Sequence, residues 1–137
     1  MTSGQTDLST LINTMEPVLD PNIWVFSTGL STDLFTAGRV SQSAILMRFV
    51  ENEGETWIWL KSEADRQSVP YTFESRRITL NIHSSLEAVG FMAAIATALA
   101  KAGISCNPVS GFFHDHVFVP ADRAEDAMTV LETLSRS

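Results

Sequence analysis

The sequence predicts an α+β protein with antiparallel sheets and with helices on one face. Segments that alternate polar and apolar residues are interleaved with segments whose apolar residues recur every three or four positions. Between residues 77 and 134 the order is strand, helix, strand, strand, helix, and a weaker version of this order precedes it. Residues 57–63 align with residues 116–122, as an internal repeat would require.

Composition and charge exclude several classes of function. The 137 residues are 45% hydrophobic, which is typical of a folded globular protein, and the net charge of −7 argues against a nucleic-acid partner. One cysteine, Cys106, excludes an internal disulfide and a multi-cysteine zinc site and suits a reducing compartment. The opening residues do not form a signal peptide, and the apolar run 89–100 is shorter than the roughly 20 residues that span a bilayer. We therefore expect a cytoplasmic protein with no membrane partner.

The best-defined element pair is the strand expected at 77–82 and the helix that follows it. Ser84 and Glu87 form an S-x-x-E capping box, which predicts a helix that begins at about Ser85. Gly103 predicts its end.

This helix carries two apolar stripes, although a helix lying on a sheet at the surface needs only one. The first stripe comprises Leu86, Val89, Ala93, Ala96 and Ala100. The second contains Phe91, Met92, Ile95 and Ala98. The second stripe needs cover, either from the rest of the chain or from another subunit. In the latter case Phe91, Met92 and Ile95 form a subunit interface.

The remaining elements of the second half are strands at 104–109 and 116–119 and a helix at 121–134. Pro108 marks a sheet edge, a bulge or the end of its strand. The order β-α-β-β-α gives the first five elements of a ferredoxin-like (βαββαβ) fold. The sixth, a final strand after the last helix, is missing. A strand borrowed from the first half, or pairing between subunits, would complete the sheet.

The first half predicts a degenerate copy of the same fold. A short helix at 7–15 precedes it. Its elements are strands at 23–28, 44–50 and 56–60, a short helix at 62–67 and a strand at 71–73. Residues 30–43 are poorly periodic, with a single helical turn expected around Asp33–Phe35, so this copy has lost most of its first helix. We divide the chain into an N-terminal helical segment (1–17), a degenerate half (18–75) and a second half (76–137).

The second half resembles the ACT domain family. The resemblance rests on the helix end and strand Ala100–Asn107 (AKAGISCN), followed by the hairpin and helix start Val117–Ala127. It covers about the last 60 residues. Within that family the chain is similar to small bacterial tandem-ACT proteins and to the regulatory region of aspartate kinases. The resemblance implies two ACT-type halves and a regulatory role.

The candidate ligand site is the loop that joins the first strand of the second half to its helix. A loop at a helix N-terminus offers amides to an anion such as an amino-acid carboxylate. The resemblance places effector amino acids at this loop, next to the following strand and at a domain or subunit interface. Carried onto this chain, the positions are His83, Ser84, Ser85 and Leu86, with Cys106, Asn107 and Pro108 opposite. Many amino-acid-binding members have an Asp-x-Pro-Gly loop where this chain has His-Ser-Ser-Leu.

Two other groups invite chemistry. His114, Asp115 and His116 have the residue types of a metal site, but they straddle an expected hairpin turn, where polar residues are common. Cys106 could act as a nucleophile only with a lowered pKa and a nearby base, and its place in a strand favours a buried structural thiol. We therefore expect no catalytic residue, no metal and no cofactor.

The sequence thus favours a non-catalytic regulatory or sensor module that binds a small molecule, an amino acid above all, and acts as a homodimer. The alternative is a structural homodimerisation domain with a vestigial ligand site, whose working surface is Phe91, Met92 and Ile95. An enzyme ranks third.

Overall fold

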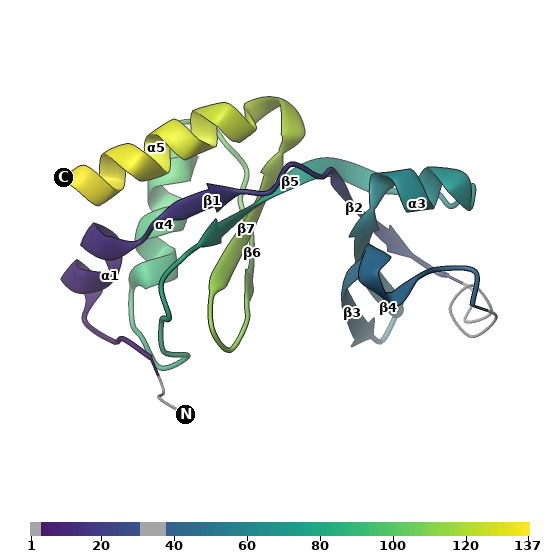
Figure 1. The fold of residues 1–137 in the computed structure, drawn as a ribbon, viewed down its shortest axis with the longest axis horizontal. Helices are drawn as coiled ribbons and strands as arrows, with labels where there is room; N and C mark the ends of the chain where they lie inside the picture. The colour runs from purple at the N-terminus through teal and green to yellow at the C-terminus, as the bar shows by residue number, and fades with distance from the viewer. Residues whose placement is uncertain (1–3, 31–37) are drawn as a thin grey trace. The chain divides into compact units, whose positions relative to one another are not determined.

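The computed structural model describes residues 4–30 and 38–137. The chain forms two compact units (Figure 1). Unit 1 contains the described residues up to Pro21 together with residues 76–137, and unit 2 contains residues 22–75. The segment before residue 22 therefore packs with the second half of the chain. The limits 18–75 and 76–137 remain predictions about the two sequence halves.

Unit 1 is built on four strands in the order β1-β5-β7-β6. They are β1 (Pro17–Leu19), β5 (Thr72–Leu80), β6 (Asn107–Ser110) and β7 (Asp115–Pro120). The short strand β1 pairs antiparallel with β5, with Pro17 opposite Leu80. This strand from the start of the chain supplies the fourth strand that the second half lacks, which confirms one of the two alternatives for completing the sheet.

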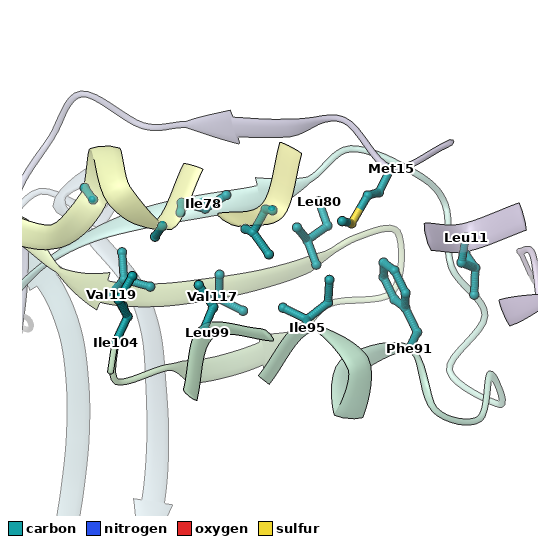
Figure 2. Packing of buried hydrophobic residues seen from close by; sticks show 13 residues of the cluster. Leu11, Met15, Ile78, Leu80, Phe91, Ile95, Leu99, Ile104, Val117 and Val119 are labelled. Carbon is teal, nitrogen blue, oxygen red and sulfur yellow. The ribbon is translucent and has the colours of Figure 1, made fainter. Parts of the chain in front are cut away.

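The helices of unit 1 pack on one face of these strands (Figures 1 and 2). They are α1 (Leu8–Thr14), α4 (Phe91–Lys101) and α5 (Ala124–Arg136), with a 3₁₀ turn, η2 (Ala121–Arg123), before α5. Ile78 and Leu80 of β5 and Val117 of β7 are fully buried in this core, as the period of two in the strands predicts. Each such side chain contributes about 1.5–3 kcal/mol on burial.

The expected start of α4 is wrong, and its end is confirmed. The helix begins at Phe91, six residues later than predicted, after Gly90 with φ of +91°. The capping box does not form: the Glu87 amide donates to the Ser85 hydroxyl, and the Ser84 hydroxyl donates to Asp115. Gly103, with φ of +72°, follows the helix and takes a left-handed conformation that favours glycine.

The second apolar stripe of α4 is covered by the chain itself. Phe91 is 3% exposed and Ile95 is fully buried, and both point into the core of unit 1 (Figure 2). Met92 is partly buried against the same core. Of the two alternatives for this stripe, cover within the chain accounts for Phe91 and Ile95. Leu86 and Val89 of the first stripe precede the helix and are largely exposed.

Unit 2 has strands in the order β3-β4-β2-β5, to which β5 contributes its residues up to Ser75. Its elements are β2 (Trp24–Thr28), the 3₁₀ turn η1 (Gln42–Ala44), β3 (Ile45–Glu51), β4 (Gly54–Leu60) and α3 (Lys61–Arg66). The pairings of β2 with β4, β3 with β4 and β2 with β5 are antiparallel. Trp57 and Trp59 are buried in the core of this unit. The helical turn expected around Asp33–Phe35 lies outside the described residues.

The two strands expected at 71–73 and 77–82 form one strand, β5. Ser75 does not break the strand, because its buried hydroxyl donates a hydrogen bond of 2.7 Å to the carbonyl oxygen of Trp24.

Candidate functional site

The loop between β5 and α4, residues 81–90, is the element on which the predicted ligand site depends. Ser84 and Ser85 are buried, at 5% and 6% exposed. The Ser84 hydroxyl donates to Asp115 Oδ2 at 2.7 Å, and the Ser110 hydroxyl donates to Asp115 Oδ1 at 2.5 Å. Asp115, only 9% exposed, therefore joins the loop to the hairpin of β6 and β7.

The start of the chain holds the same loop through its backbone. The amide of Gln5 donates to the carbonyl oxygen of His83 at 2.8 Å, and the amide of Ser85 donates to the carbonyl oxygen of Gln5 at 2.8 Å. These two bonds form an isolated parallel bridge between Gln5 and Ser84. The loop is thus fixed by a side chain from the hairpin and by backbone from the N-terminal segment.

We expected the amides of this loop to be free to bind a ligand, but several of them donate hydrogen bonds within the chain. Besides Ser85, the amide of Ser84 donates to the carbonyl oxygen of Ile82 at 2.9 Å. The amides of Glu87 and Ala88 both donate to Ser85, to its hydroxyl and its carbonyl oxygen respectively. Ser85 therefore closes a local turn, and α4 begins only after the loop has ended. His83–Leu86 therefore do not lie at the start of a helix, as the predicted anion site required.

His83 is the loop residue with unmet hydrogen-bonding capacity. Its Nε2 atom is buried and has no hydrogen-bond partner among the described residues. The imidazole ring lies 6.0 Å from the ring of Phe112 and 5.3 Å from that of Phe113, measured between centroids. Both phenylalanines are about half exposed, at 49% and 51%. Buried polar atoms are rarely left without a partner, so this niche is the best candidate among the loop residues for a contact with a ligand.

The other half of the predicted site lies elsewhere on the hairpin. Asn107 pairs with Phe118 and Pro108 with Val117, whereas the loop meets the hairpin at its other end, where Ser110 pairs with Asp115. In this register Asn107 and Pro108 precede the pair of Ser110 and Asp115 that contacts the loop. The half-buried Cys106 has a thiol pKa raised by burial, which disfavours the thiolate that a nucleophile needs.

The triplet at the start of β7 is divided among different contacts. Asp115 accepts from the two serines, and His116 Nδ1 lies 2.9 Å from the hydroxyl oxygen of Thr79. Burial, together with Arg77 and His114, lowers the pKa of His116. Over residues 4–30 and 38–137, no three His, Cys, Asp or Glu side chains are gathered in a way that could hold a metal ion.

Sequence reasoning missed Gln5, Asp115 and the two phenylalanines as neighbours of the loop. A signal for Asp115 was present, because it lies in register with Val117 and Val119, two core residues of the same strand. A carboxylate at a core position needs hydrogen-bond donors, and the buried Ser84 and the exposed Ser110 provide them. No comparable local signal marks Gln5.

Unit 2 contains an open pocket of about 340 Å³. It is lined by Phe26, Ser27, Thr28, Thr56, Pro70, Tyr71 and Thr72. The Ser27 hydroxyl donates to the carbonyl oxygen of Pro70 and the Tyr71 hydroxyl donates to Asp65. None of these described lining residues carries a charge that would pair with the charged groups of an amino acid.

Comparison with known proteins gives matches over both halves. Residues 3–76 and residues 72–133 each match an ACT domain family. Among solved structures, a Vibrio cholerae protein of unknown function, described as a possible transport protein, is 34% identical, with a TM-score of 0.79 over 93% of this chain and 95% of that chain. An Agrobacterium tumefaciens protein is 13% identical, with a TM-score of 0.71 over 88% and 89% of the two chains.

The ligand-free regulatory subunit of aspartate kinase from Thermus thermophilus is 14% identical, with a TM-score of 0.63 over 90% of this chain and 97% of that chain. The search of curated proteins gives no match. These neighbours confirm the predicted α+β fold of two ferredoxin-like halves and the resemblance to the aspartate kinase regulatory region. No helix in the described part of the chain has the length and apolar character needed to cross a membrane.

Proposed function

Because the chain belongs to the ACT domain family, we propose that it is a non-catalytic regulatory module that binds an amino acid at the loop between β5 and α4. The unpaired Nε2 atom of His83 carries this proposal. It provides a nitrogen for a polar group of the ligand, next to the exposed rings of Phe112 and Phe113. Such rings offer an apolar surface to the ligand's side chain. The regulatory role is supported by the fold shared with the aspartate kinase regulatory subunit.

We include Ser84, Ser85 and Leu86 in the site as neighbours of His83 in the loop. Cys106, Asn107 and Pro108 would join it from a second copy of the chain, since one chain keeps them at the other end of the hairpin. Pro108 lies in β6, the last strand in the sheet order of unit 1. The module would therefore act as a homodimer in the cytoplasm, and a ligand would shift the balance between subunit arrangements.

The alternative of a purely structural homodimerisation domain loses the surface on which it was based. Phe91 and Ile95 are buried in unit 1 and are unavailable to a partner. Ligand binding is therefore the better-supported function.

A thermal-shift screen against the twenty amino acids tests the proposal, with the mass measured by light scattering in parallel. A ligand at about 100 times its dissociation constant stabilises the folded state by about 2.7 kcal/mol. His83→Phe keeps an aromatic ring and removes the ring nitrogens, so it should abolish the shift. His114→Phe, on the neighbouring hairpin, is the matched control and should keep it. A hit that survives in His83→Phe would place the site elsewhere, and the absence of any hit would reject an amino acid as the ligand.

A further inference from the structure

The N-terminal segment Gly4–Asp7, which we name the strap, occupies the loop of the proposed site. Gln5 forms backbone hydrogen bonds on both sides of Ser84, to the carbonyl oxygen of His83 and to the amide of Ser85, each 2.8 Å long. The acceptor for the Ser85 amide is a carbonyl oxygen of the chain itself. A ligand carboxylate that used this amide would need the same N–H.

Gly4 shows how closely the strap approaches the loop. Its φ is +95°, and a Cβ atom added there would lie 2.8 Å from the amide nitrogen of Ser85 and 2.9 Å from the carbonyl oxygen of His83. Both atoms belong to the backbone and cannot rotate away as the end of a side chain could. A side chain at this position is therefore incompatible with the docked strap, for reasons of conformation and of space.

The strap is anchored at its far end, where it leads into α1. The Gln5 side-chain oxygen accepts from the amides of Thr6 and Asp7, and Asp7 caps α1 through the amide of Thr10. The hydrogen bonds from Thr10 lower the pKa of Asp7. α1 itself is fixed by the buried side chain of Leu11. Gln5, Thr6 and Asp7 are exposed and none of them belongs to the buried core cluster that holds Leu11, so α1 can stay in place when the strap is released.

We propose that the strap regulates ligand binding by competing for the loop. When it is docked, the Gln5 carbonyl holds the Ser85 amide and Gly4 covers the backbone of residues 83–85. When it leaves, that amide becomes available to a carboxylate next to His83. Docking of the strap and binding of a carboxylate ligand at this loop are then mutually exclusive. This inference rests on the proposed function, because it names the regulation of the same site.

Hydrogen exchange measured residue by residue, together with the amino-acid screen, tests the strap in the full chain. Gly4→Val should release it. The Ser85 amide should then exchange at least about tenfold faster than in the unmodified chain, whereas amides of β7 should be unchanged. The apparent dissociation constant of any amino acid that binds should fall, because molecules with a docked strap no longer reduce the fraction of the protein that can bind the ligand.

Two further variants keep the test decisive. Gln5→Pro removes the amide that donates to His83 and provides a second route to release if Gly4→Val fails to fold. Gly29→Val is the matched control, because Gly29 also has positive φ, at +66°, and a Cβ there meets no described atom within 4 Å. It should leave exchange at Ser85 and amino-acid binding unchanged.

The outcomes separate the strap from the proposed function. Equal dissociation constants in the unmodified chain and in a variant with fast exchange at Ser85 would refute competition between the strap and the ligand and leave the binding function intact. Unchanged exchange at Ser85 in both strap variants would also overturn the strap. If exchange accelerates but none of the twenty amino acids shifts the melting temperature of any protein, the proposed function fails, and the regulatory role of the strap fails with it.

Discussion

Ser84→Ala should destabilise unit 1 through Asp115 and not through the start of α4. The Ser84 hydroxyl is buried and donates to a carboxylate at 2.7 Å. Removing a hydrogen bond of this kind costs about 1.5–3 kcal/mol. Loss of an ordinary N-cap costs about 1 kcal/mol, with a range that overlaps. The size of the loss alone therefore does not identify the partner of Ser84.

A double-mutant cycle identifies it. In the Asp115→Ala background the acceptor is already gone, so Ser84→Ala should cost little more. The two losses should fall short of additivity by about 1–2 kcal/mol, because residues in direct contact share one interaction energy. Ser105→Ala, an exposed serine before β6, serves as the control and should change stability by less than about 0.5 kcal/mol.

The assay must observe unit 1. The tryptophans, Trp24, Trp57 and Trp59, all lie in unit 2, so their fluorescence follows that unit. Far-UV circular dichroism during urea unfolding reports mainly on unit 1, since α1, α4 and α5 belong to it and unit 2 contains the shorter α3. Recording both signals also shows whether the two units unfold together. If Ser84→Ala costs the same with and without Asp115, the hydroxyl stabilises the chain by another route and the account of this loop is wrong.

Two further predictions follow from burial. Ile95→Asp places an unpaired charge at a fully buried position and should unfold unit 1, seen as loss of the helical dichroism. Met92→Asp, at a partly buried position, should keep the fold. A folded Ile95→Asp protein of half the mass would instead support the subunit interface predicted from the sequence. The pKa of His116 is lowered in the folded state, so its contribution to stability is full above the unfolded pKa and is lost as the pH falls through the folded pKa. The urea midpoint should therefore drop as the pH falls through and below about 6.5, the ordinary pKa of a histidine, and His116→Phe should reduce that drop. An equal drop in the variant would assign the dependence to other groups.

The sequence by itself determined the elements that depend on local spacing. Alternation in β5 identified Ile78 and Leu80 as core residues, and both are fully buried. The three-and-four spacing of α5 placed Ala127 and Leu131 on its buried face. Gly103 marked the end of α4, because the conformation it adopts is costly for most other residues. These features involve neighbours within one or two turns of helix, or alternate residues of one strand, and a linear pattern records them.

Only the tertiary structure decided how distant segments meet. Ser84 has the spacing of a helix cap, yet its partner is Asp115, 31 residues along the chain, and no local pattern tells a hydroxyl which of two partners it will have. The same holds for β1, which completes the sheet of unit 1 from the start of the chain. It also holds for Ile95, because an apolar stripe on a helix does not specify which segment will pack against it. From the sequence alone, the candidate site could therefore be assigned to a loop but not to the contacts that the loop makes. The contacts of that loop with Gln5 and Asp115 depend on how the chain folds back on itself.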